Sequence, residues 1–263
     1  MTRSFVFALF LMVLCSMIPI VSPRVHADGI DDIAGGLMLP EDLEVKVWAK
    51  SPLFFNPTSI DVDERGRVWV AEAVNYRVYN NKSRMKLRRE KGDRIVIVED
   101  SDGDGLADRS KVFVQDEDLV APLGVTVAGR HVLVACSPRL LIFDRDESDR
   151  MVGKRILLEG FGGVDHDHSL HRVELGPDGD WYFNVGNAGP HKVTDRSGWN
   201  LRSGSWYTGG SPYNKTNQAG LKSDDGRVYS AGVAFRVEPT GRGLHVIGYG
   251  FRNPYGMAVD SFG

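Results

Sequence analysis

The sequence has 263 residues, of which 42% are hydrophobic and 25% charged, and its formal net charge is −3. This is the composition of an ordinary globular protein, long enough for one large β domain with a hydrophobic core. The small negative charge and the lack of a basic face argue against a nucleic-acid partner. The 30 glycines and 12 prolines favour many short strands joined by turns.

Residues 1–27 have the features of an export signal. Arg3 precedes a mostly apolar stretch over 5–21, and Val-His-Ala at 25–27 is a small-x-small cleavage site. We therefore expect an exported protein, periplasmic or secreted, with an uncleaved segment that anchors the chain in a membrane as the alternative. Cleavage would leave Cys136 as the single cysteine, so no intrachain disulfide is expected, and the sequence contains no C-x-x-C-H haem motif.

After a linker over 28–40, residues 41–263 contain short apolar runs bounded by Gly, Asp or Asn, with no sustained helical periodicity. Residues 199–226, rich in Gly and Ser, are predicted to form a long loop whose Trp and Tyr side chains either stack on sugar rings or pack the loop. The predicted strands are 45–49, 59–62, 68–72, 95–99, 111–114, 124–127, 131–136, 140–143, 155–158, 172–175, 181–185, 234–238 and 244–249.

A hairpin pattern repeats at 60–71, 125–135 and 173–184, and begins again at 257–263. Residues 97–102 also resemble residues 141–146, which indicates a repeat of roughly 40–50 residues, the length of a four-stranded propeller blade. We therefore expect an all-β fold, a β-propeller with about four blades present, and a β-sandwich is the alternative. Because the last copy stops in its turn, we expect an N-terminal fragment that is inactive in isolation.

Residues 165–172 (DHDHSLHR) contain three histidines. Alternation along a strand would place His166 and His168 on one face. Three interpretations remain open: a hydrogen-bonded blade edge, a metal site for which H-x-H alone is weak evidence, or a catalytic base. The third follows because neutral imidazole titrates near working pH, and Asp167 could orient it.

Residues 250–258 (GFRNPYGMA) place Arg252 and Asn253 directly before Pro254. This order favours an extended or turn conformation, and the flanking glycines allow a tight turn. A guanidinium beside an amide suits a planar, polyoxygenated ligand such as a carboxylate-bearing quinone. The alternative is a structural turn whose arginine pairs with a neighbouring blade.

Together these two segments resemble the soluble aldose sugar dehydrogenases that use pyrroloquinoline quinone. His168 and Arg172 are followed by LGPDGDWYFNVGN at 175–187, and the turn at 250–258 follows in the same order as in that family. The segments DERGRVWVAE and EDSDGDGLAD, earlier in the chain, are most similar to exported membrane-bound dehydrogenase propellers, which often carry a haem c domain. The resemblance covers residues 41–263.

The resemblance implies a six-bladed propeller that oxidises an aldose or related sugar alcohol. It implies His168 as the general base, with Arg252 and Asn253 binding and polarising the quinone oxygens. It further implies calcium on the quinone, held by residues after 263, and a haem c domain or other electron acceptor outside this chain. The family's early glutamine contact has no convincing counterpart, because 122–124 (PLG) occupy that region. A non-catalytic propeller that binds carbohydrate or protein is the alternative.

An acidic loop stands apart from these motifs. Alternating carboxylates followed by Gly can converge on a hard cation such as calcium. Lys111 stands where an EF-hand would need Glu, so the loop is either a weak calcium site or a solvated hairpin turn. Its carboxylates are Asp100, Asp102, Asp104 and Asp108.

Overall fold

The computed structural model describes residues 36–78, 86–204 and 220–260, and this part of the chain is all-β. Its strands form three four-stranded antiparallel sheets and one three-stranded sheet. None of the described residues forms a helix that is long and apolar enough to cross a membrane.

The three four-stranded sheets follow one another along the chain. The first contains β1 (Pro57–Val62), β2 (Val68–Glu72), β3 (Arg94–Glu99) and β4 (Arg109–Gln115). The second contains β5 (Gly124–Ala128), β6 (His131–Cys136), β7 (Arg139–Arg145) and β8 (Met151–Glu159). The third contains β9 (Leu170–Leu175), β10 (Trp181–Val185), β14 (Gly232–Val237) and β15 (His245–Phe251).

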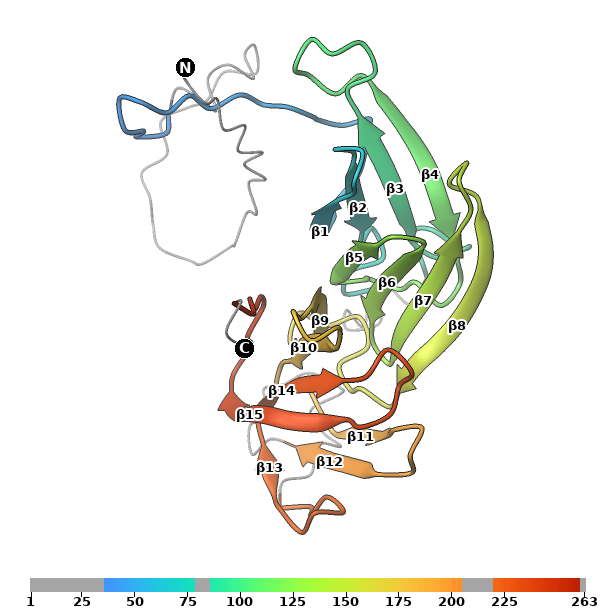
Figure 1. Ribbon diagram of the computed structural model, residues 1–263, viewed down its shortest axis with the longest axis vertical. Helices are drawn as coiled ribbons and strands as arrows, with labels where there is room; N and C mark the ends of the chain where they lie inside the picture. The colour runs from blue at the N-terminus through green and yellow to red at the C-terminus, as the bar shows by residue number, and fades with distance from the viewer. Residues whose placement is uncertain (1–35, 79–85, 205–219, 261–263) are drawn as a thin grey trace.

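These sheets are arranged in an arc, with β1, β5 and β9 on its inner side and β4, β8 and β15 farther out (Figure 1). The inner strands contact one another in sequence order. Each sheet is therefore a blade, which confirms the predicted all-β propeller fold and excludes the two-sheet sandwich. The described residues contain three four-stranded blades. The remaining sheet is an insertion between β10 and β14, made of β11 (His191–Thr194), β12 (Asn200–Gly204) and β13 (Tyr229–Ser230).

Aspartates begin several of the hairpin turns. Asp63 accepts the backbone N–H groups of Arg65 and Arg67 with one carboxylate oxygen, at 3.0 Å each. Asp146 accepts two backbone N–H groups in the same way after β7, and Asp195 does so after β11. A carboxylate that satisfies turn amides stabilises the reversal of the chain, which explains why Asp recurs in the repeated pattern.

The cores lie between neighbouring sheets. Trp69 and Phe113 of the first sheet pack with Phe143 of the second. Phe183 and Phe235 of the third sheet meet Phe161, which precedes that sheet in the chain. Because these rings are buried almost completely, they contribute most of the apolar area that holds one blade against the next.

One carboxylate connects the inner strands of all three sheets. Asp61 of β1 accepts the backbone N–H of Val127 in β5 at 2.6 Å and the guanidinium of Arg172 in β9 at 2.9 Å. Arg172 also donates to the backbone oxygen of Ile60 at 2.9 Å. Arg172, part of the family-like motif, therefore ties blades together on the inner side of the arc.

Three expectations about individual segments were wrong. Residues 45–49 form no strand, and Trp48 and Ala49 instead pack on the outer face of the first sheet. The predicted loop over 199–226 contains a strand, β12, which the high Gly and Ser content of this segment did not reveal. Trp206, Tyr207 and Tyr213 lie outside the described residues. Residues 257–260 form no strand.

Close packing of inner strands makes Gly124 a sensitive position. A Cβ atom there would lie 2.5 Å from the Arg172 Cα atom, too close for any real contact. We expect Gly124→Ala to lower the free energy of unfolding by about 3 kcal/mol, the upper range for overpacking, as measured by urea denaturation. Gly256→Ala is the control, because a Cβ there meets nothing within 4 Å. Equal stability of the two variants would contradict this close approach.

Candidate functional site

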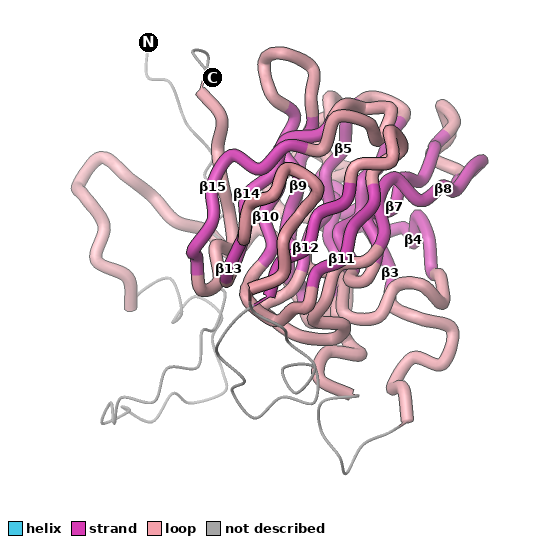
Figure 2. The backbone as a smooth tube through the Cα atoms, turned by 90° about the horizontal axis from the view of Figure 1, so that it is seen from below, coloured by secondary structure: helices cyan, strands magenta, loops and turns pink. Residues whose placement is uncertain are grey.

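The loops that join the strands lie at two ends of the blades, as the tube view shows (Figure 2). In an antiparallel sheet with strands in sequence order, the turns after the first and third strands share one end. The loop after the second strand and the connection to the next blade share the other end. Residues 73–93, 160–169 and 252–260 therefore belong to one end of the molecule.

His168 lies in the connection from β8 to β9. The expected strand over 165–168 was wrong, because this segment forms turns in which Asp165 has a φ of 58°. The turn nevertheless brings the two histidines together. The His168 N–H donates to Nδ1 of His166 at 2.9 Å, and the rings stand at 89° with centroids 5.2 Å apart.

The tautomer of His168 is fixed by Asn187, which follows β10. His168 Nδ1 lies 2.6 Å from the Asn187 Oδ1 atom. An amide oxygen only accepts, so Nδ1 carries the proton and Nε2 presents its lone pair. His168 is 7% exposed, and Asp167 Oδ2 lies 3.9 Å from its Nε2. In this arrangement Nε2 is able to accept a proton, and a carboxylate lies beside it.

Asn187 also holds the segment that contains Arg252. Its backbone N–H donates to the Arg252 carbonyl oxygen at 2.9 Å. A Cβ on the adjacent Gly186 would lie 2.6 Å from both Asn253 Oδ1 and His168 Cα, so the two predicted segments meet across this glycine. The Arg252 side chain is exposed and makes no ion pair or hydrogen bond with the described residues.

Asn253 and Tyr255 attach the segment that contains Arg252 to β9 and β1. His171 Nε2 donates to Asn253 Oδ1 at 2.8 Å, and the Tyr255 ring lies 4.4 Å from the His171 ring. The Tyr255 hydroxyl donates to the Thr58 carbonyl oxygen of β1 at 3.1 Å. Burial raises the pKa of Tyr255 to about 12, so the hydroxyl keeps its proton and remains a donor at neutral pH.

Tyr76 and Arg77, in the loop after β2, complete the site and were missed in the sequence. Arg77 donates to Asp167 at 2.6 Å and to the Tyr76 hydroxyl at 2.8 Å. Burial alone would raise the pKa of Asp167, but the Arg77 guanidinium and His166 lower it below its usual value. No motif marks Tyr76 or Arg77. The available signal is an Asn-Tyr-Arg sequence shortly after a fully buried strand.

The half-buried His166 and the buried His171 and His191 lie at or behind the site in neutral form. Burial lowers the pKa of His166, His171 and His191 to about 4 each. His191 has a structural role, because its Nδ1 accepts the Gly162 N–H and its Nε2 donates to the Gly186 backbone oxygen, each at 2.9 Å. At neutral pH the charged side chains that act on His166 are those of Asp167, Arg77 and Arg252.

The acidic loop lies at the opposite end, in the turn between β3 and β4. Asp100, Asp102 and Asp104 offer oxygens within 4.8 Å of one another, whereas Asp108 accepts from the N–H and hydroxyl of Ser101. Asp100 accepts the N–H groups of two glycines in the turn, at 2.7 and 2.8 Å. These carboxylates stabilise the turn. The loop lies at the other end of the blades from His168, so a cation bound there would not contact His168.

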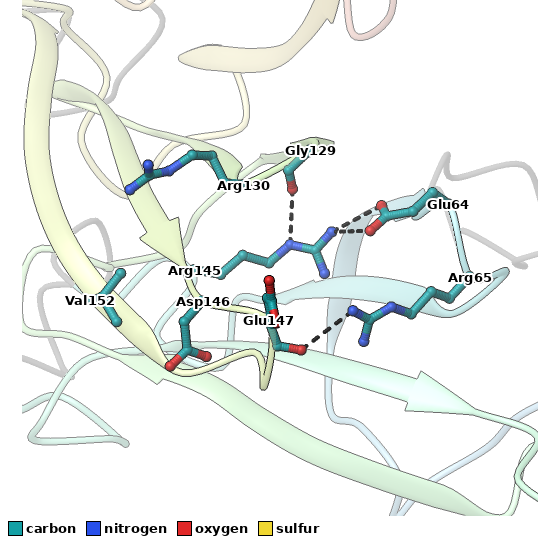
Figure 3. Close-up of a pocket in the computed structure, with 8 residues that line it drawn as sticks. All are labelled: Glu64, Arg65, Gly129, Arg130, Arg145, Asp146, Glu147 and Val152. Atoms are coloured by element: carbon teal, nitrogen blue, oxygen red, sulfur yellow. Dashed lines mark hydrogen bonds and ion pairs between the residues drawn. The ribbon is translucent and has the colours of Figure 1, made fainter.

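A separate cavity of about 590 Å³ also lies at that opposite end, between the first and second sheets. Figure 3 shows Arg145 at its base, bonded to the Gly129 carbonyl and to both oxygens of Glu64, with Arg65 bonded to Glu147. Arg145 is thus paired with the Glu64 carboxylate, whereas Arg65 donates to the backbone oxygen of Glu147. No described histidine lines this cavity, so we place the candidate site at the end of the blades that holds His166 and His168.

Comparisons with known proteins give one family match and several similar solved structures. A family model described as a domain of unknown function (DUF7133) matches residues 31–263. No curated protein matches the sequence. Similar solved structures include the holo pyranose dehydrogenase PQQ domain from Coprinopsis cinerea, with 17% identity and a TM-score of 0.41 over 76% of this chain and 40% of that chain. They also include the periplasmic gluconolactonase of Pseudomonas aeruginosa, with 17% identity and a TM-score of 0.38 over 80% of this chain and 62% of that chain.

The neutral buried histidines predict a loss of stability in mild acid. Between pH 6.5 and 4 the unfolded chain binds a proton at His171 that the folded state does not, so stability falls as pH falls. We expect the drop in unfolding free energy between pH 7 and pH 5 to be about 2 kcal/mol smaller in His171→Gln than in the parent. Urea denaturation at both pH values measures it. His245→Gln, at an exposed position on β15, should leave the drop unchanged; a change equal to that of His171→Gln would refute the assignment.

Proposed function

This chain belongs to the DUF7133 family, a domain of unknown function, and we propose that its site oxidises a hydroxyl of an aldose or related sugar alcohol with a bound quinone as acceptor. The observation that carries the proposal is the double role of Asn187. Its side chain fixes His168 as a base, and its backbone holds the Arg252 segment beside that base.

The residues fit an anionic, polyoxygenated cofactor such as pyrroloquinoline quinone. The Arg252 guanidinium is exposed, and no described residue accepts from it, so it can donate to carboxylate or quinone oxygens. The Oδ1 atom of Asn253 is taken by His171, which turns the amide N–H groups of Asn253 toward other acceptors. Arg252 and Asn253 would hold the cofactor, and the bound quinone would supply a two-electron acceptor.

The protein's own part in the reaction is proton transfer and orientation. His168 Nε2 takes the proton of the substrate hydroxyl while a hydride leaves the carbon that bears it, so the alcohol becomes a carbonyl. The Asp167 carboxylate, 3.9 Å from Nε2, stabilises the positive charge that His168 gains. Arg77 keeps that carboxylate ionised and in place through its 2.6 Å contact.

The proposal extends to the setting of the enzyme. We propose that the enzyme acts in the periplasm or outside the cell, with residues 1–27 as an export signal that is cleaved or remains as an anchor. Electrons leave the reduced cofactor for a haem c domain or another acceptor outside this chain. A calcium ion that assists the quinone would be bound by residues other than Asp100, Asp102, Asp104 and Asp108.

The test is sugar-dependent dye reduction by the full-length protein with pyrroloquinoline quinone and calcium added. We expect His168→Gln to lower turnover about 10²-fold or more, as for loss of a general base, while the absorbance of bound quinone persists. Arg252→Ala should weaken quinone binding. Arg242→Ala is the matched control, because this exposed arginine lies in the turn between β14 and β15, at the other end of the same sheet.

Two results would contradict the proposal. One is a protein whose absorbance shows no bound quinone. The other is sugar binding, measured by calorimetry, without dye reduction, which would identify a non-catalytic carbohydrate-binding propeller.

A further inference from the structure

His166 and His168 are neighbours whose rings have opposite tautomers. A backbone N–H can only donate, so the bond from His168 N–H makes His166 Nδ1 an acceptor. In the neutral ring the proton must then sit on Nε2. In His168 the order is reversed, because Nδ1 donates to Asn187 and Nε2 holds a lone pair. The pair therefore presents one N–H donor and one acceptor.

Neither Nε2 atom has a hydrogen-bond partner among the described residues. The His166 and His168 side chains are 12% and 8% exposed, so neither ring is sealed from solvent. The ring centroids lie 5.2 Å apart. Two nitrogens that bond one oxygen lie within about 6 Å of each other, twice an ordinary hydrogen-bond length. The closeness of the two rings is compatible with a hydroxyl group that bonds both Nε2 atoms.

We propose that His166 is a second catalytic residue, whose Nε2–H donates to the same substrate oxygen from which His168 Nε2 takes the proton. The inference rests on the proposed function of this site. A hydroxyl group is both donor and acceptor, so it satisfies both rings at once and is held in one orientation. As the hydroxyl proton moves to His168, the oxygen gains charge and the His166 bond strengthens.

The surroundings keep His166 a donor throughout. Burial lowers its pKa to about 4, and although Asp167 opposes this shift, His168, Arg77 and Arg252 add to it. His166 therefore stays neutral at working pH and does not compete with His168 for the proton. This division of labour, in which one neutral imidazole donates and the other accepts, resembles the pairing of a base with a neutral electrophile at other enzyme sites.

Two substitutions separate the donor from the structural role of His166. His166→Asn keeps an acceptor near the Nδ1 position for the His168 N–H but removes the Nε2–H donor. His166→Gln keeps an amide donor near the Nε2 position but loses that acceptor. We expect His166→Asn to lower kcat for aldose oxidation about 10²-fold, the effect of removing one such donor, with an unchanged melting temperature. His166→Gln should melt at lower temperature yet lose less than tenfold in kcat.

The reverse pattern, with His166→Asn fully active and His166→Gln inactive, would show a purely structural role and overturn the inference while leaving the proposed function intact. The tautomers are read independently from the ¹⁵N shifts of the two rings in the full protein by NMR. A proton on Nδ1 of His166 would overturn the inference whatever the activity. A wild-type protein that oxidises no aldose would overturn the proposed function, and the inference with it.

Discussion

The contact on which the arrangement depends is the Asp61 carboxylate at the inner side of the arc. It accepts from β5 through a backbone N–H and from β9 through Arg172, so strands of three blades meet at one side chain. The Arg172 guanidinium also donates to the backbone oxygen of Ile60 in β1. Apolar packing between sheets tolerates small sliding movements, but a charge-assisted bond of this geometry does not. It therefore sets the register of the blades relative to one another.

That register decides which loops meet. Tyr76 and Arg77 come from the first blade, His166 to His168 from the entry to the third, and Arg252 to Tyr255 from its exit. They are joined in pairs: Arg77 to Asp167, Asn187 to both His168 and Arg252, and Tyr255 back to β1. The site is consequently a property of the assembled blades, and a disturbance of the inner strands, such as a side chain at Gly124, would be expected to displace it.

Sequence patterns were sufficient for the hairpins, because alternation together with Asp and Gly in the turns specifies both strands and turn; β2, β6 and β10 were predicted with their observed bounds. Sequence patterns failed for segments whose conformation depends on contacts with residues distant in the sequence. Residues 45–49 have the alternation of a strand but cover the apolar face of the first sheet without joining a ladder. The placement of His168 beside Arg252 came from a family resemblance. Arg77 could not be found this way, since its partner Asp167 is distant in sequence and the pairing exists only when two blades meet.

The hydrogen bonds of His166, His168, His171 and His191 explain why the proposed chemistry is assigned to the first two. Both nitrogens of His191 are bonded to backbone groups, and in His171 one nitrogen is bonded to Asn253 while the other is sealed from solvent. In His166 and His168, Nδ1 forms a hydrogen bond, and Nε2 has no hydrogen-bond partner among the described residues. The same bonds that shape this turn thus determine which ring donates and which accepts. A single change of partner, such as loss of the Asn187 acceptor, would release the tautomer of His168 without moving its ring far, and would remove the base while leaving the fold in place.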